Sequence, residues 1–145
     1  MKIVIDTNIV FSAILNSNSR IGQILLQPDK DIQFYSVKYL QTEIRKHFNK
    51  IKNIIKIPDS EIFILIETLF GRIQFISEEL IPRDIRLIAD ELTKSIDFDD
   101  TLFVALALHL DCKLWTGDKH LIDGLSLKSF KNIITTQELI NLSLK

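Results

Sequence analysis

Short runs of apolar residues recur along the chain and predict the strands of a buried sheet. The clearest two are Lys2–Ile5, which ends at Asp6, and residues 113–116, which end at Gly117. Weaker examples are residues 33–35, 73–76 and 133–134. Continuous apolar runs are typical of strands that helices cover on both faces. The pattern therefore predicts a sheet of four or five parallel strands.

Between these runs, apolar residues recur every three or four positions, which predicts helices. The longest is expected to begin at Ser36, a good N-terminal cap, and to continue to Ile55. The others are expected over residues 9–15, 20–27, 61–70, 82 to about 95, 119–125 (helix or loop) and 136–144. Strands that alternate with helices indicate an α/β domain, here with a two-helix insertion before the third strand.

Residues 97–118 form the most informative segment. It begins with Asp97, Asp99 and Asp100, continues as an apolar helix, and passes through a short strand to Gly117-Asp118. Asp100 is spaced to share a helical face with residues that pack on the sheet, so its carboxylate is expected at the rim of the sheet. Asp99 is the expected N-cap, and Asp97 is expected to act through water. Taken singly, each acid is explained as well by a cap or a turn.

Acids recur where core elements begin or end. Asp6 follows the first strand, Asp118 follows the fourth, and Asp100 opens the buried helix. If the two strands are neighbours, these acids meet at a topological switch point, and Glu43 can reach them from the long helix. Close carboxylates repel one another, and a hard cation such as Mg²⁺ or Mn²⁺ relieves that repulsion. The alternative for Glu43 is a pair with Lys46 or His47 on its own helix.

Composition limits the classes of protein that fit. With 145 residues, 46% of them hydrophobic, the chain is expected to form one domain over residues 1–145. A single cysteine forms no disulfide within the chain, and no apolar run approaches the ~18 residues of a membrane span, so we expect a cytoplasmic protein without membrane contact. The net charge of −1 indicates no partner.

Several of these segments together resemble the PIN-domain ribonucleases. They are Val4–Asn8 (Val-Ile-Asp-Thr-Asn), Glu43 in a long helix, Asp97–Ala107 and Thr116-Gly117-Asp118. The resemblance implies a Rossmann-like αβα sandwich and cleavage of single-stranded RNA that depends on one or two Mg²⁺ or Mn²⁺ ions. It places Asp6, Glu43, Asp100 and Asp118 as the catalytic and metal-binding acids, with Asn8, Asp97 and Thr116 in support.

The same resemblance bears on partners. Many small members resemble VapC, the toxin of a toxin–antitoxin pair, so the expected partners are RNA and a cognate antitoxin. Lys38, Arg45, Lys46 and Lys50 lie on the long helix and are predicted to contact RNA phosphates, although a solvated helix surface explains them equally well. Phe63, Leu69 and Phe70 are candidates for a homodimer or antitoxin surface.

Other functions fit less well. A haloacid-dehalogenase-like phosphatase needs a second aspartate two residues after the first, and Asn8 stands there. Dinucleotide-binding and phosphate-loop motifs need glycine patterns that the chain lacks. The remaining alternative is a catalytically inactive PIN-like module that binds RNA or protein, although such a module has no need of four mutually repelling acids.

Overall fold

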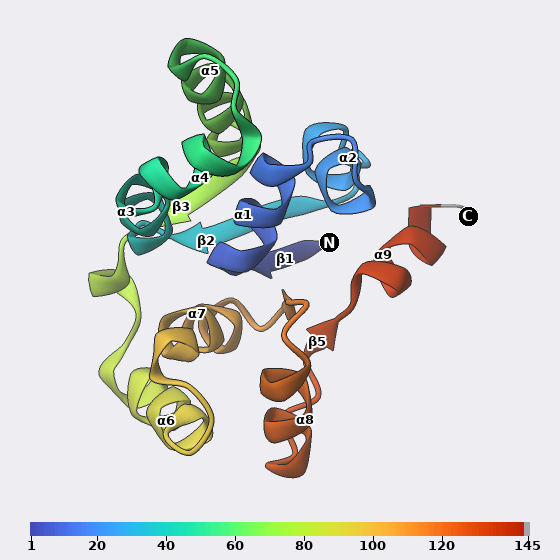
Figure 1. The fold of residues 1–145 in the computed structure, drawn as a ribbon. Coiled ribbons are helices and arrows are strands. Elements are labelled where there is room, and N and C mark those ends of the chain that lie inside the picture. Colours follow the sequence, from blue (N-terminus) through green and yellow to red (C-terminus); the bar gives the residue numbers. More distant parts are fainter. Residues whose placement is uncertain (144–145) are drawn as a thin grey trace.

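Five parallel strands form one sheet at the centre of the protein (Figure 1). The structure is a computed structural model that describes residues 1–143. In chain order the strands are β1 (Lys2–Ile5), β2 (Gln33–Val37), β3 (Ile73–Ile76), β4 (Lys113–Trp115) and β5 (Ile133–Ile134). Their order across the sheet is β3-β2-β1-β4-β5, so β1 lies between β2 and β4. The predicted α/β fold with a parallel sheet of four or five strands is confirmed, and the sheet has five.

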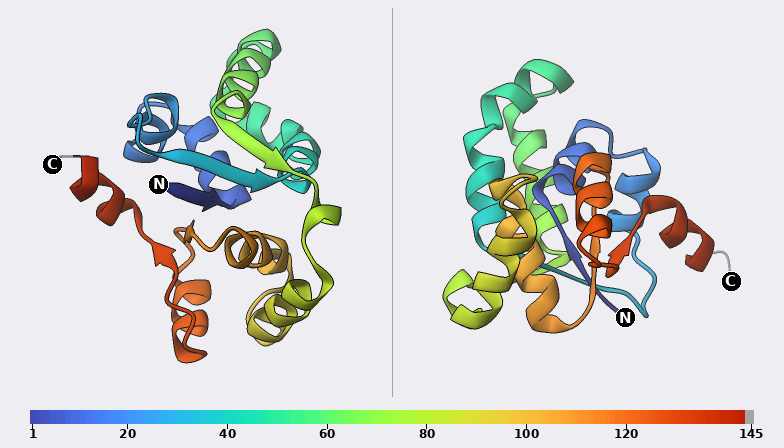
Figure 2. Two further views of the ribbon diagram at one scale, coloured as in Figure 1. Left: turned by 180° about the vertical axis from the view of Figure 1, so that it is seen from behind. Right: turned by 90° about the horizontal axis from the view of Figure 1, so that it is seen from below.

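Helices cover both faces of this sheet (Figures 1 and 2). One face carries α1 (Thr7–Leu15), α2 (Arg20–Leu26), α3 (Tyr39–Lys46), α4 (Phe48–Ile55) and α5 (Asp59–Phe70). The other carries α7 (Thr101–Leu110), with α6 (Arg83–Thr93) packed outside it. Helix α8 (Lys119–Leu127) contacts α6, and α9 (Thr136–Ser143) contacts α2. Two short 3₁₀ turns, η1 (Glu78–Leu80) and η2 (Phe98–Asp100), complete the described elements.

Helix α7 is apolar on most of its surface because it lies between two layers. It packs on β1, β2 and β4 and is covered from outside by α6. All residues from Phe103 to Ala107 are buried as a result. On the sheet itself, the rings of Trp115 and Phe34 lie 5.8 Å apart between centroids, and Trp115 Nε1 donates a hydrogen bond to Thr136 Oγ1. This central packing fixes the strand ends that carry the acids.

The helix expected to start at Ser36 is different in the structure. Ser36 lies inside β2, where its buried hydroxyl donates to the carbonyl of Ile5 over 2.8 Å. Pairing with β3 extends β2 to Val37, opposite Ile76, so the helix starts at Tyr39. The helix also breaks at His47 into α3 and α4, since the His47 backbone (ψ 13°) leaves the helical range. The prediction of a single helix capped by Ser36 was wrong.

The remaining differences lie at helix ends and on α5. Residues 119–127 are helical, and the expected end of the last helix, Leu144, lies outside the described residues. On α5, Phe63 is 54% exposed, whereas Leu69 and Phe70 are buried in the core. Leu69 and Phe70 are therefore excluded as surface residues. No helix among residues 1–143 is long and apolar enough to cross a membrane.

Candidate active site

The exits of β1 and β4 bring two aspartates side by side. The strands pair in parallel, with Ile5 opposite Trp115, so Asp6 and Asp118 follow adjacent strand ends as predicted. Each caps the next helix: Asp6 Oδ1 accepts from the Ile9 N–H at 3.0 Å, and Asp118 Oδ1 accepts from the N–H groups of His120 and Leu121. The N-cap bonds fix both carboxylates at the rim of the sheet.

Asp6 and Asp100 are buried carboxylates without full compensation. They are 1% and 7% exposed, and the Oδ2 atom of each is buried without a hydrogen-bond partner among the described residues. Burial raises the pKa of Asp6 to about 6; the Asp118 charge acts in the same direction, while Thr116 and the Ile9 N–H oppose the rise. Burial also raises the pKa of Asp100 to about 7, with Asp6 as the next contributor.

One open cavity of about 240 Å³ collects the predicted acids. Six carboxylates line it: Asp6, Glu43, Asp97, Asp99, Asp100 and Asp118. Asn8 lines it too, whereas Thr116 is buried behind Asp118 and accepts the Asp118 N–H on its hydroxyl. Glu43 Oε1 accepts a 2.6 Å hydrogen bond from Thr7 Oγ1. Its hydrogen-bond partner thus lies on α1, whereas the alternative interpretation paired Glu43 with Lys46 or His47 on its own helix.

Asp97, and not Asp99, is the N-cap of this segment. The Asp97 side chain accepts from the Asp99 N–H at 2.9 Å, whereas the Asp99 side chain is exposed. The prediction was wrong because the η2 turn precedes α7, so the chain begins to coil two residues earlier than the sequence pattern indicated. Asp100 is the buried acid of the three, and it lines the cavity together with Asp6 and Asp118, at the rim where its carboxylate was expected.

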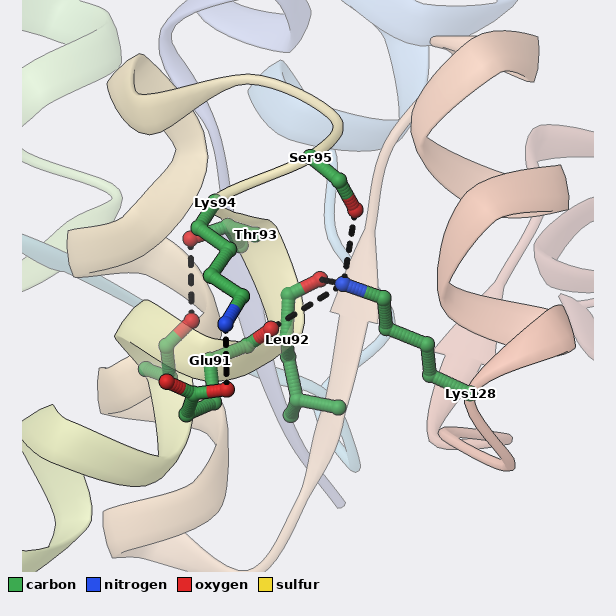
Figure 3. Close-up of polar contacts among 7 residues, drawn as sticks. Glu91, Leu92, Thr93, Lys94, Ser95 and Lys128 are labelled. Atoms are coloured by element: carbon green, nitrogen blue, oxygen red, sulfur yellow. Dashed lines mark hydrogen bonds and ion pairs between the residues drawn. The ribbon is translucent and has the colours of Figure 1, made fainter.

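Lys128, at the end of α8, holds the segment that leads to these acids (Figure 3). Its ammonium donates to the carbonyls of Glu91 and Leu92 and to Ser95 Oγ, over 2.8–3.1 Å. These contacts cap the C-terminal end of α6, where the helix dipole favours a positive charge. Lys128 was not predicted, because a lysine after an amphipathic helix carries no local signal of a contact 33–37 residues away.

Two further contacts fix the same segment. The buried hydroxyls of Thr93 and Thr101 lie 2.6 Å apart and join the end of α6 to the start of α7. A β-carbon on Gly124 would come within 2.6 Å of the Ile96 side chain, so glycine lets α8 pack closely on the connection. The loop that bears Asp97 and Asp100 is thus anchored on both sides.

The carboxylates suit a hard divalent cation. Asp6 and Asp100 each offer a buried oxygen without a partner, and a cation would compensate both. No three His, Cys, Asp or Glu side chains among residues 1–143 converge closely enough to hold a metal by themselves. That arrangement still fits Mg²⁺, which commonly takes one or two protein carboxylates and fills its other positions with water and substrate phosphate.

The four basic residues that were predicted to contact RNA divide into two groups. Lys50 lines the cavity, whereas Lys38, Arg45 and Lys46 do not. Lys46 Nζ lies 5.8 Å from the ring centroid of Tyr39. The four residues therefore do not form one continuous wall of the site, and their contact with RNA stays a prediction.

Comparison with known proteins places this site in a family context. A family model described as PIN domain matches residues 4–139. A solved structure, the crystal structure of VapBC2 from Rickettsia felis bound to a DNA fragment from their promoter, has a chain similar in fold: the TM-score is 0.65 at 17% identity, over 93% of this chain and 97% of that one. At this identity the structural likeness shows the fold alone. A search of curated proteins gave no match.

Proposed function

This chain belongs to the PIN-domain family, a family of nucleases, and we propose that it is a metal-dependent endoribonuclease that cleaves single-stranded RNA. One observation supports this most: the two buried, unpartnered carboxylate oxygens of Asp6 and Asp100 border a cavity lined by four further acids. PIN-domain nucleases generally use divalent metal ions. A purely structural site would gain nothing from carboxylates whose burial raises their pKa values toward neutrality.

The acids divide by exposure. Asp6 and Asp100 would hold one or two Mg²⁺ or Mn²⁺ ions directly, and the more exposed Glu43 and Asp118 would bind through water or from the side. Asn8, Asp97 and Thr116 support them. A bound divalent cation polarises a phosphoryl oxygen and lowers the pKa of water.

The protein's own groups orient and deprotonate the attacking water. Thr7 holds Glu43 at the cavity by a 2.6 Å hydrogen bond, and the N–H groups of His120 and Leu121 hold Asp118. Both carboxylates can accept a hydrogen bond from water and take up its proton. None of the acids is assigned as a covalent nucleophile. Water forms the new bond to phosphorus and the 3′-oxygen leaves, which gives 5′-phosphate and 3′-hydroxyl ends, as the family resemblance implies.

A cleavage assay tests this proposal. We expect the purified protein to cut a labelled single-stranded RNA in Mg²⁺ or Mn²⁺, to stop in excess EDTA, and to leave the RNA intact when Asp100 is replaced by asparagine. Cleavage that continues undiminished in EDTA would refute the metal dependence. A wild-type protein that cuts no RNA from a mixed-sequence pool with either metal would refute the ribonuclease.

The second candidate is a non-catalytic PIN module that binds RNA or protein. It is favoured by the finding that no three metal-binding side chains converge among the described residues. The two candidates differ in their response to metal. Mn²⁺ should raise the melting temperature of a nuclease, because a ligand bound to the native state stabilises it, and should leave an inert module unchanged.

We further propose that the protein is the toxin of a toxin–antitoxin pair. The support is the likeness in fold to a chain of a VapBC2 structure. We expect a neighbouring reading frame to encode a small DNA-binding protein that copurifies with this chain and suppresses its cleavage. A neighbouring product that neither binds nor inhibits would contradict the proposal.

Phe63 and Ile64, both exposed on α5, are candidates for a homodimer surface, which monomeric sedimentation at high concentration would exclude.

A further inference from the structure

The cavity has a second wall of different chemistry. Phe11 from α1, His47 from the junction of α3 and α4, and Lys50 from α4 line it together. The rings of Phe11 and His47 meet edge to face, with centroids 6.3 Å apart and planes at 74°. Lys50 Nζ lies 5.4 Å from the centroid of the Phe11 ring. Phe11 therefore contacts both of the other side chains.

Lys50 is a cation without an anionic partner in an acidic cavity. Six carboxylates line the same cavity, yet Lys50 forms no ion pair with any residue in the described part of the chain. It is also the single lysine or arginine among the described lining residues. Its contact with Phe11 is a cation–π interaction at an exposed site, which is weak, so the ammonium keeps its capacity for an anion.

The break between α3 and α4 creates this wall. His47 ends α3, its N–H shared between the carbonyls of Glu43 and Ile44, and α4 starts at the next residue. The two helices thus carry Glu43 and Lys50 to the same cavity. His47 is exposed at the junction and lines the cavity, so its ring is accessible to a ligand there.

We propose that Phe11, His47 and Lys50 form a binding subsite for the RNA nucleotide next to the scissile phosphate. Lys50 binds the phosphate of that nucleotide, and the base stacks on His47. Phe11 is a positioning residue that holds both side chains at the cavity. The division of charge follows: Asp6 and Asp100 take the cation, and the wall of Phe11, His47 and Lys50 takes the phosphate anion and the base. This subsite rests on the proposed RNA substrate.

RNA binding without cleavage tests the subsite directly. An Asp100→Asn background keeps the RNA intact, and affinity for a fluorescent single-stranded RNA is measured against salt in Mg²⁺. Lys50→Gln should flatten the log–log salt slope by about 0.7, the value for one phosphate contact on a single strand, whereas Lys50→Arg should preserve it. His47→Ala should weaken binding on the order of 10-fold, as for the loss of one base stack, without changing the slope.

Lys2 supplies a matched control. Its ammonium lies 5.7 Å from the Tyr35 ring centroid, so it makes the same kind of contact, but at the start of β1, away from the strand exits that form the site. Lys2→Gln should change neither affinity nor slope. For Phe11, the replacement by leucine should reduce both affinity and slope, while tyrosine, which keeps the ring, should restore them.

The outcomes separate this subsite from the proposed function. If the wild-type protein cuts RNA but Lys50→Gln binds like Lys2→Gln, the subsite is wrong and the ribonuclease stands. If the salt slope depends on Lys50 while the wild-type protein cuts nothing, the subsite stands as an RNA-binding site and the ribonuclease is wrong. Failure of the Asp100→Asn protein to bind RNA at all would overturn the subsite, whatever the cleavage assay shows.

Discussion

The two walls of the cavity are built in opposite ways. On the acid wall, Asp6 and Asp100 are buried, and the segment around Asp100 is anchored by Lys128 and by the Thr93–Thr101 contact. On the other wall, His47 and Lys50 are exposed, and Glu43 has one side-chain hydrogen bond, to Thr7, among the described residues. Asp6 and Asp100 are thus fixed before any ligand arrives, whereas Glu43, His47 and Lys50 can adjust to one.

This difference has an energetic reason. Burying a carboxylate without a partner costs free energy, and a rigid surround is needed to keep it from turning toward water. Exposed side chains carry no such cost and need no such support. We therefore expect substitutions of the buried acids themselves to change stability and activity in opposite directions, and substitutions on the other wall to have small effects on stability.

The largest effect is expected from Asp100→Asn. The amide removes one buried negative charge, so the melting temperature in EDTA should stay the same or rise. RNA cleavage in Mn²⁺ should fall on the order of 100-fold or more, because loss of a residue that only supports a metal ligand typically costs about 10–100-fold. Asp99→Asn is the control, since Asp99 is exposed. Normal cleavage by Asp100→Asn would mean that the acid wall is assigned to the wrong residue.

The metal-free protein should lose stability as pH rises. Asp6 and Asp100 keep their protons in the folded state up to about pH 6 and 7, whereas the unfolded chain loses them near 3.8. The folded state therefore binds more protons between these values, and its added stability, fully present below about pH 4, is lost through pH 6–7. Each unit of pKa difference corresponds to about 1.4 kcal/mol.

Urea unfolding in EDTA at pH 5 and pH 8 measures this loss. The difference between the two pH values should be smaller for Asp100→Asn than for the wild-type protein, because the variant lacks one of the two titrating groups. Equal differences would show that the buried acids do not control the pH response. Saturating Mn²⁺ should reverse the trend, since the cation binds the ionised carboxylates.

Lys128→Met tests how the acid wall is anchored. The variant loses three hydrogen bonds at the end of α6, and we expect the free energy of unfolding to fall by about 1–2 kcal/mol, with weaker metal-dependent cleavage. Lys94→Met is a matched control, because Lys94 forms a surface pair with Glu91 at 2.9 Å that contributes little. Equal destabilisation by the two variants would argue against a specific anchor.

The smallest effect on stability is expected on the opposite wall. Thr7→Val keeps the shape of the side chain but removes the hydrogen bond to Glu43, and should lower the free energy of unfolding by about 0.5–1.5 kcal/mol. Cleavage should fall because Glu43 is no longer held at the cavity. Thr7→Ser, which keeps the hydroxyl, should retain activity; if it does not, the methyl group and not the hydrogen bond is what matters.

The sequence by itself determined the sheet and the positions of the acids along it. Continuous apolar runs located β1 and β4, and acids that follow parallel strands lie at one rim of the sheet, so the meeting of Asp6 and Asp118 was predicted on the condition that the two strands are neighbours, which they are. The helical spacing of Asp100 also predicted that its carboxylate reaches this rim, and Asp100 lines the cavity with Asp6 and Asp118. These features depend on continuous apolar runs and on the helical period of 3.6 residues, both of which a single sequence records.

Tertiary structure alone decided how the site is finished. The pairing of β2 with β3 drew Ser36 into the sheet, and the η2 turn gave the cap to Asp97 instead of Asp99. The contacts of Lys128 with α6 and of Lys50 with Phe11 join residues 33 or more positions apart. No local period encodes such contacts, because they depend on how packed layers bring distant segments together.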